Sequence, residues 1–432
     1  MKRYAMESLK RWKNSARRKP LMVYGARQVG KTWLMQEFGR TEFKNVLYLN
    51  FDKNEKARRI FGENIDPFYI ISLLENNFEI KIDPKNTLLI FDEIQESQRA
   101  KDSLKYFNEE APEYHIVAAG SFLGVATGKF PVGQVNRLTI YPMSFYEFLE
   151  AIGRNQLLGT LQKLNPRMIA GLSGTASELL KSYFYVGGMP AAVQTYAKTR
   201  DMRKVREVQD FILDNYKGDF SKHIKGVDIP KVRMLWDSIP AHLAKEKKKF
   251  IYKEIKSGGR AAEFENAMDW LVNTGLVYKV MRTETAKIPL LSYQQRDIFK
   301  LFMLDVGLLC AHSKIDMKTF LQPDANIFDD FKGALTEQFV LQELKNLTTN
   351  PILYWVNEKG HSEIDFVLQY NGEIVPIEAK SSENTRAKSL KIYMDMEKPA
   401  HAVRISLKNY GVRDNLYSVP LYMMGSFLDI IF

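Results

Sequence analysis

Eight residues near the N-terminus constrain this chain more than any other part of its sequence. The segment GARQVGKT fits the pattern GxxxxGK[ST] at every fixed position, and it consists of Gly25, Ala26, Arg27, Gln28, Val29, Gly30, Lys31 and Thr32. An apolar segment precedes it at 21–24, and apolar residues with helical spacing follow it at 33–38. In that strand–loop–helix setting the glycines let successive backbone N–H groups converge on phosphate oxygens. The segment therefore predicts a nucleotide phosphate site, in which Lys31 reaches the β- and γ-phosphates of ATP and Thr32 ligates Mg²⁺.

A second segment, TLLIFDE at 87–93, predicts the acidic partner of that site. Its apolar residues indicate a buried strand, and the strand delivers Asp92 and Glu93 to its carboxyl end. Ligands bind at the carboxyl ends of strands in open α/β sheets. Asp92 is predicted to hold Mg²⁺ through water, and Glu93 is predicted to polarise the water that attacks the γ-phosphate.

The rest of the first third alternates strand and helix patterns. Apolar strand patterns lie at Leu21–Gly25, Val46–Asp52, Leu88–Asp92 and His115–Gly120, with a less regular one at Val135–Tyr141. Helical patterns separate them, as at Ile70–Phe78 and Gln98–Glu109. This alternation predicts an α/β fold with a parallel sheet covered on both faces, the arrangement of a P-loop NTPase.

At this point the chain resembles the AAA-type predicted ATPases that carry an uncharacterised C-terminal region. The resemblance extends over nearly the whole chain and rests on GARQVGKT, LLIFDEIQ, AAGSFLG, YPMSFYEFL, FYVGGMP, FKLFMLDVGLL and EIDFVLQ…IEAK. It implies that Ser121 senses the γ-phosphate. The family tends to carry Gly-Arg where this chain has Gly133-Gln134, so Arg137 is the candidate for the trigger arginine.

Charge points to the middle of the chain. The whole chain of 432 residues has a formal net charge of +11, and residues 151–330 contain 28 Lys and Arg against 20 Asp and Glu. Helical patterns at Lys231–Lys245, Tyr252–Ile255 and Ala261–Asn273, followed by strand patterns at Leu276–Arg282 and Lys287–Tyr293, resemble a winged-helix domain, a common reader of duplex DNA. Basic residues near Ala261–Asn273 predict DNA as a partner, and the alternative is a winged helix that packs only against protein.

The last hundred residues contain a candidate nuclease site. Glu337 lies in the helix pattern Ala334–Leu347, Asp365 in a strand pattern at 364–370, and Glu378 with Lys380 in the next, after an Asn371-Gly372 turn. This order resembles the PD-(D/E)XK nuclease-like superfamily, although Ile364 replaces the motif's Pro. In such a site two carboxylates would hold Mg²⁺, while Lys380 would orient water or stabilise the phosphorane charge. The alternative is a structural cluster of salt bridges.

Composition excludes several classes of protein. No apolar run approaches the roughly 18–20 residues of a membrane helix, and the basic N-terminal segment lacks the apolar stretch of a secretory signal, so a cytoplasmic protein is expected. Cys310 is the single cysteine, which excludes a disulfide framework.

Together these patterns predict four parts: a P-loop ATPase core (1–145), a helical lid (146–226), a winged-helix-like domain (227–325) and a small α/β restriction-endonuclease-like domain (326–432). The leading function is a Mg²⁺-dependent ATPase that acts as a DNA-associated switch or ATP-driven nuclease. The alternative is a regulatory ATPase that binds protein partners, or further copies of itself, without nuclease activity.

Overall fold

The computed structural model describes residues 1–120, 133–223, 228–245, 249–316, 329–357, 362–381 and 388–432. They form two compact units. The first unit contains Met1–Tyr141 and Asn273–Gly275, and the second contains Pro142–Val272 and Leu276–Phe432. The predicted boundaries at 226/227 and 325/326 lie outside the described residues.

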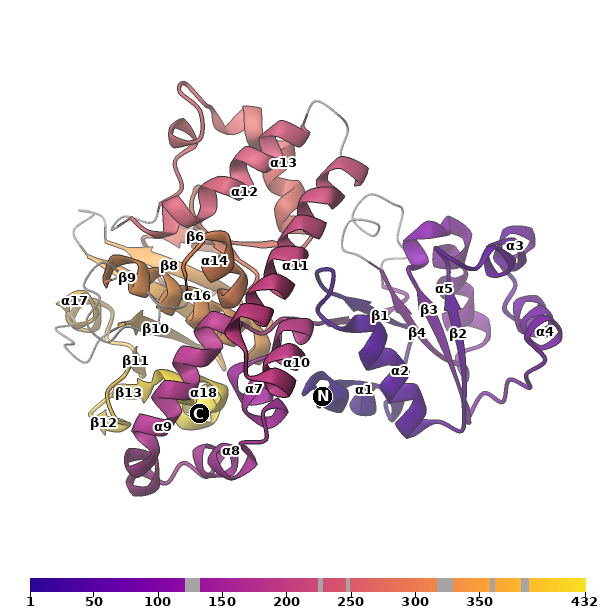
Figure 1. Cartoon of the computed structure of the whole chain (residues 1–432), viewed down its shortest axis with the longest axis horizontal. Helices are drawn as coiled ribbons and strands as arrows, with labels where there is room; N and C mark the ends of the chain where they lie inside the picture. The colour runs from indigo at the N-terminus through magenta and orange to yellow at the C-terminus, as the bar shows by residue number, and fades with distance from the viewer. Residues whose placement is uncertain (121–132, 224–227, 246–248, 317–328, 358–361, 382–387) are drawn as a thin grey trace. The chain divides into compact units, whose positions relative to one another are not determined.

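The first unit is an α/β sandwich built on a parallel sheet (Figure 1). Within the described residues the sheet has the strand order β2-β3-β4-β1-β5. Its elements are α1 (Ala5–Lys13), β1 (Leu21–Tyr24), α2 (Lys31–Glu42), β2 (Asn45–Asn50), α3 (Glu55–Glu63), α4 (Pro67–Phe78), β3 (Thr87–Asp92), η1 (Ile94–Glu96), α5 (Gln98–Glu110), β4 (His115–Ala119) and β5 (Asn136–Thr139). The prediction of a parallel sheet is confirmed, because every pair of neighbouring strands in it runs parallel.

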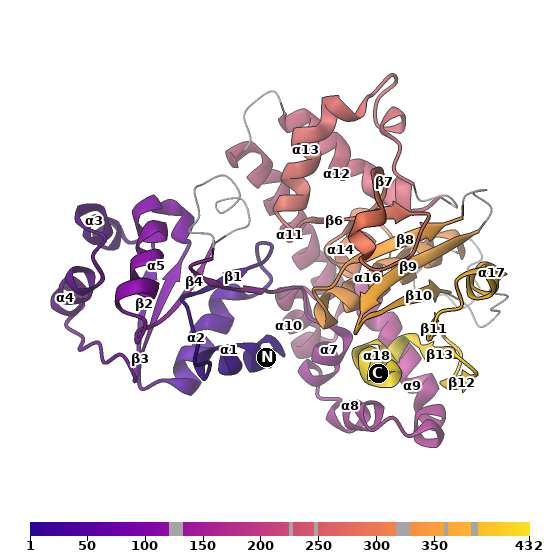
Figure 2. The same cartoon turned by 180° about the vertical axis from the view of Figure 1, so that it is seen from behind.

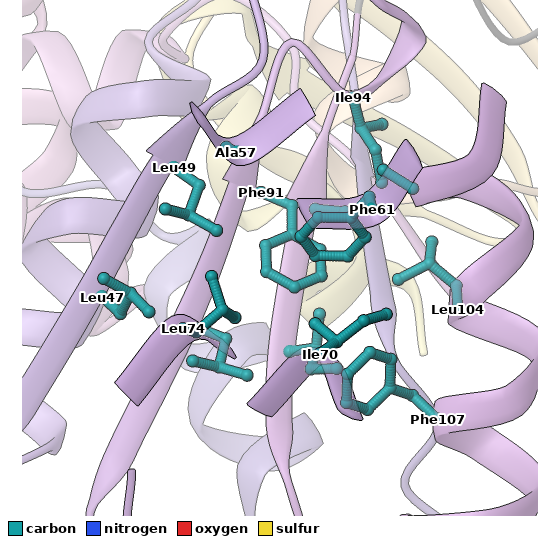
Figure 3. Packing of buried hydrophobic residues seen from close by; sticks show 14 of the residues in the cluster. Leu47, Leu49, Ala57, Phe61, Ile70, Leu74, Phe91, Ile94, Leu104 and Phe107 are labelled. Atoms are coloured by element: carbon teal, nitrogen blue, oxygen red, sulfur yellow. The ribbon is translucent and has the colours of Figure 1, made fainter. Parts of the chain in front are cut away.

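Apolar side chains of the strands and of the helices between them form one buried cluster on this sheet. Phe91 of β3 makes edge-to-face contacts with Phe51 and Phe61, whose ring centroids lie 5.8 and 5.3 Å away. Figure 3 shows Phe91 beside Phe61 in this core. Ile70 and Leu74 of α4 belong to the same buried cluster. β3 is buried along its whole length. A rigid core thus fixes the carboxyl ends of β1 and β3, where the predicted site lies.

The second unit begins with helices that pack around one another. They are α7 (Phe145–Ala151), α8 (Asn155–Gln162), α9 (Pro166–Val186), α10 (Pro190–Thr199), α11 (Met202–His223), α12 (Ile229–Leu243), η2 (Tyr252–Glu254) and α13 (Ala261–Asn273). Helix α12 packs on strand β7 (Figure 2).

A mixed sheet forms the remainder of the second unit. Within the described residues its order is β12-β13-β11-β10-β9-β8-β6-β7. Its elements are β6 (Val277–Thr283), η3 (Leu290–Tyr293), β7 (Gln294–Met303), α14 (Val306–His312), α16 (Asp329–Leu347), β8 (Ile352–Val356), β9 (Glu363–Tyr370), β10 (Glu373–Ala379), α17 (Lys388–Glu397), β11 (Ala402–Ser406), β12 (Gly411–Arg413), β13 (Leu416–Pro420), η5 (Leu421–Ser426) and α18 (Phe427–Ile431). β6 pairs with β8, so the hairpin expected as a wing belongs to the same sheet as the C-terminal strands.

The second strand of that hairpin is displaced from its predicted position. β6 pairs antiparallel with Gln294–Met303, not with Lys287–Tyr293. Pro289 has no N–H to give to a ladder, and the N–H of Leu290 donates to the side chain of Gln369 at 2.7 Å. The chain therefore resumes strand pairing only after η3.

Candidate functional site

The predicted phosphate loop leaves the carboxyl end of buried strand β1 and runs close to neighbouring backbone. Gly25 has φ of +149°, and a Cβ on this residue would lie 2.4 Å from the carbonyl oxygen of Ile140. Gln28 and Gly30 also have positive φ values, 66° and 93°. Only glycine fits the first of these positions without strain or collision, so the glycine of the motif is required by the fold as well as by phosphate.

Lys31 opens helix α2 with its ammonium folded back on the loop. Its Nζ donates to the carbonyl oxygens of Gly25 and Ala26 at 2.9 and 2.8 Å. Burial of the ammonium lowers the pKa of Lys31 to about 8, although Glu93 and Asp92 oppose the shift. An anion in the loop would favour the charged form, as a phosphate-binding lysine requires.

The carboxylate of Asp92 lies beside the loop's hydroxyl. Its Oδ2 accepts hydrogen bonds from Thr32 Oγ1 and from the Tyr48 hydroxyl, each at 2.8 Å. Burial, aided by Asp92, raises the pKa of Tyr48 to about 12, so the phenol stays a neutral donor. Carboxylate and hydroxyl oxygens are the hard donors that Mg²⁺ prefers, so Thr32 and Asp92 fit a magnesium ion bound together with phosphate.

Glu93 follows Asp92 in the left-handed conformation, with φ of 50°. Its backbone N–H donates to Asp92 Oδ1 at 3.1 Å, and its Oε2 accepts from Gln95 Nε2 at 2.5 Å. Gln95 was not predicted from the sequence. The sequence feature that could have indicated Gln95 is its position, because a residue two places after a strand-ending Glu can turn back to that carboxylate.

The two remaining predicted residues of this site have different outcomes. Ser121 lies outside the described residues. Arg137 is exposed on the edge strand β5, with its guanidinium carbon 5.9 Å from the ring centroid of Tyr24 in the neighbouring strand. Its assignment as the trigger arginine stays a prediction.

Arg3 supports the loop from the N-terminal segment, and sequence analysis missed it. This arginine is 5% exposed, and it donates to the carbonyl oxygens of Val29 and Tyr141, both at 2.7 Å. A buried guanidinium with two backbone acceptors fixes the middle of the loop relative to the chain that follows β5.

The candidate nuclease residues come together in the second unit. β9 and β10 are antiparallel with Ile377 opposite Phe366, and Asp365 Oδ2 accepts from the backbone N–H of Ala379 at 2.8 Å. Glu378 Oε1 and Lys380 Nζ are 2.8 Å apart. The second oxygen of Glu378 is buried and has no hydrogen-bond partner among the described residues.

A lysine that sequence analysis missed completes this cluster. Lys300 of β7 is 1% exposed, and its Nζ lies 3.4 Å from Glu337 Oε2 and 2.5 Å from Glu363 Oε1. Burial alone would lower the pKa of Lys300, but the carboxylates of Glu337, Glu363 and Asp365 outweigh burial and raise it. Burial would likewise lower the pKa of Lys380, but the charges of Asp365 and Glu378 outweigh burial and raise it. The sequence feature that could have indicated Lys300 is a lysine inside the apolar run IFKLFML.

The basic residues near α13 divide into two groups. Lys245 pairs with Glu254 at 2.6 Å, and Lys256 pairs with Glu263 at 2.7 Å. Three further cations are exposed and have no ion pair among the described residues; they are Lys249, Lys253 and Arg260.

Three segments of the chain match known families. Residues 17–149 match the AAA domain. Residues 177–319 match a domain of unknown function (DUF8612), and residues 332–424 match another domain of unknown function (DUF4143). No curated protein matches the sequence. Residues 17–149 are therefore an AAA-type P-loop ATPase domain, which confirms that part of the resemblance, while the winged-helix-like and nuclease-like parts stay predictions.

Solved structures to which the chain shows low similarity include three proteins that share 12–14% identity with it. The Thermotoga maritima RuvB Holliday junction branch migration motor has a TM-score of 0.31 and covers 64% of this chain and 86% of its own. Aeropyrum pernix Orc1 in complex with DNA has a TM-score of 0.28, with 73% and 92% covered. AMPPCP-bound DnaA from Aquifex aeolicus has a TM-score of 0.25, with 62% and 85% covered. At these scores they add nothing to the assignment of residues 17–149 to the AAA domain.

Within the described residues, no helix is both long and apolar enough to span a bilayer.

Proposed function

We propose that the first unit binds and hydrolyses Mg²⁺-ATP, and that the chain acts as an ATP-driven switch. One observation carries the proposal: Thr32 Oγ1 and Asp92 Oδ2 are already 2.8 Å apart beside the loop that Lys31 closes. This contact joins the end of β3 to the start of α2, which is where a P-loop domain needs its magnesium donors.

The chain's own groups then divide the work. Backbone N–H groups of 25–32 and the ammonium of Lys31, which already lies against the carbonyl oxygens of Gly25 and Ala26, would hold the phosphates. Thr32 and Asp92 would hold the magnesium ion, which supplies charge neutralisation at the phosphates when bound. Glu93 orients the attacking water, and Gln95 fixes the direction of the Glu93 carboxylate.

ATP binding by Lys31→Ala tests the loop assignment. Loss of the ammonium should weaken ATP binding at least about tenfold, since a charged hydrogen bond is worth roughly 1.5–3 kcal/mol. Lys81→Ala is the matched control, because Lys81 is exposed on the same unit. Equal ATP affinity in Lys31→Ala and Lys81→Ala would remove the assignment.

The second unit is proposed to contact DNA through the exposed cations next to α13. Lys249, Lys253 and Arg260 have no acidic partner among the described residues, so their charge is available to phosphates. The excess of basic residues in 151–330 supports the same partner. If duplex DNA does not bind, the alternative is a regulatory ATPase whose second unit binds a protein.

The salt dependence of binding to a short duplex tests this part. Removing two phosphate contacts with Lys253→Gln and Arg260→Gln should reduce the slope of log K against log [salt] by about 1.8. Lys256→Gln should change the slope less, because Glu263 already neutralises Lys256. Absence of binding at low salt would contradict DNA contact and favour the protein-partner alternative.

We do not propose DNA cleavage, because Glu337 and Glu378 already pair with Lys300 and Lys380. Cleavage of plasmid or single-stranded DNA that requires Mg²⁺ or Mn²⁺ and disappears in Asp365→Ala would contradict this.

A further inference from the structure

Lys300 is a charged side chain in a place that ordinarily excludes one. It stands in the apolar half of β7, where Phe299, Leu301 and Phe302 are all buried, and it is 1% exposed itself. Moving an ammonium out of water costs several kcal/mol unless opposite charges compensate it. The residues around Lys300 must therefore act as its counter-ions.

One counter-ion, Glu337, is a residue of the candidate nuclease site, and the other, Glu363, lies two residues before Asp365 of that site on β9. Glu337 Oε2 lies 3.4 Å from Lys300 Nζ, and Glu363 Oε1 lies 2.5 Å from it. The ring of Tyr354 adds a cation–π contact, with its centroid 4.9 Å from Nζ. Glu363 and Asp365 are two residues apart on β9, so alternation along the strand puts both on the same face of the sheet. The opposite face is covered by α17, where Tyr393 packs on Trp355 and the cluster includes Ile364.

The remaining carboxylates also have donors from the protein. Asp365 Oδ2 accepts from the N–H of Ala379, and Glu378 Oε1 pairs with Lys380. One oxygen of Glu378 is left buried without a hydrogen-bond partner among the described residues. Mg²⁺ needs several oxygen donors turned toward it, whereas at least one oxygen of each of these carboxylates already faces a donor of the protein.

The donor set therefore does not fit the magnesium ion that the nuclease-like resemblance implies. The carboxylates are of the right type, but their oxygens face two lysines and a backbone N–H at hydrogen-bonding or ion-pair distance. Within the described ranges, no group of three or more His, Cys, Asp or Glu side chains is spaced to hold a metal ion.

We infer that the Lys300 ammonium takes the place of the divalent cation in this cluster, so that the second unit binds neither Mg²⁺ nor Mn²⁺ there. The lysine comes from β7, while its carboxylates come from α16 and β9. The ion pairs thus join the hairpin at 277–303 to the C-terminal strands. The cation of this cluster is therefore the Lys300 ammonium. The inference does not depend on ATP hydrolysis by the first unit.

Mn²⁺ titration of the full-length chain without nucleotide tests the inference, with and without Asp365→Asn. Any ion bound by the first unit is the same in both proteins and cancels in the comparison. The inference expects superimposable binding curves. A Mn²⁺ site in the wild-type chain that Asp365→Asn removes or weakens would overturn it.

The reverse experiment asks whether removing the ammonium opens the site. Lys300→Met keeps the stem's length and removes the charge, and circular dichroism checks that the variant is folded. The folded variant should gain Mn²⁺ binding, and adding Asp365→Asn should weaken it by about tenfold or more. A folded Lys300→Met chain that binds no more Mn²⁺ than wild type would contradict the claim that Lys300 stands in the cation's place. Should Lys300→Met not fold, the Asp365→Asn comparison alone decides.

Discussion

Glu343 gives the sharpest quantitative prediction, because it is a buried acid with too few partners. It is 0% exposed in α16. Its Oε1 accepts from the N–H of Phe145, the first residue of α7, at 2.9 Å, and its Oε2 has no partner among the described residues. Burial raises the pKa of Glu343 to about 8; the Phe145 N–H opposes this and the nearby carboxylate of Glu147 adds to it. At neutral pH the folded chain therefore holds this carboxyl mostly protonated.

The sign of the pH effect follows from that shift. A carboxyl whose pKa is higher in the folded state binds more protons folded than unfolded, so the free energy of unfolding falls as pH rises. The window runs from the ordinary value of 4.5 to about 8. Between pH 5 and pH 8 the expected loss is about 3.5 kcal/mol.

Glu343→Gln removes this titration and keeps a carbonyl oxygen for the Phe145 N–H. The variant should therefore gain stability relative to wild type by about 3.5 kcal/mol on going from pH 5 to pH 8. Asp305, whose pKa burial raises to about 6, titrates equally in both proteins and cancels.

Urea unfolding at pH 5, 6, 7 and 8 measures the difference, with the buried Trp236 and Trp355 as reporters of the second unit. Glu207→Gln is the control, because Glu207 is exposed and its curve should follow wild type at every pH. A constant difference between Glu343→Gln and wild type from pH 5 to pH 8 would refute the reasoning.

Three further predictions concern the phosphate loop and the Glu93 carboxylate of the first unit. Gly25→Ala should weaken ATP binding and destabilise the unit by about 1–3 kcal/mol, because its Cβ would lie 2.4 Å from the carbonyl oxygen of Ile140. Gly62→Ala should do neither, because a Cβ there meets nothing within 4 Å, and calorimetry compares the two variants. Arg3→Ala should weaken ATP binding about tenfold in an equilibrium assay, because the Val29 carbonyl loses its hydrogen-bond donor. Arg11→Ala should leave the affinity unchanged, because Arg11 is exposed. Equal affinities of the two variants for ATP would contradict a positioning role for Arg3. Gln95→Ala should lower the turnover number about tenfold and leave ATP affinity unchanged, because it releases only the Glu93 carboxylate, and a loss confined to affinity would count against that role.

The sequence was sufficient for the parallel sheet and its loop because both depend on local patterns. Buried strands such as Thr87–Asp92 are continuous apolar runs, and the glycines and lysine of 25–32 have fixed spacing. The helix at 261–273 also lies where its apolar periodicity predicts it.

What escaped prediction depends on contacts between distant segments. β7 begins seven residues later than expected, because Pro289 and the Gln369 side chain stop the ladder. The pairing of Lys300 with Glu363 joins residues 63 positions apart, and no spacing rule encodes it. Arg3 likewise meets Val29 only once the loop has folded.

ATP hydrolysis at the Asp92–Glu93 end of β3 is tested most directly by Glu93→Gln. The change keeps the shape of the side chain and an oxygen for the Gln95 amide, but it removes the charge that polarises water. The account predicts that Glu93→Gln binds Mg²⁺-ATP as wild type does while single-turnover hydrolysis falls by about 10²–10⁴-fold. Hydrolysis by Glu93→Gln at the wild-type rate would contradict it.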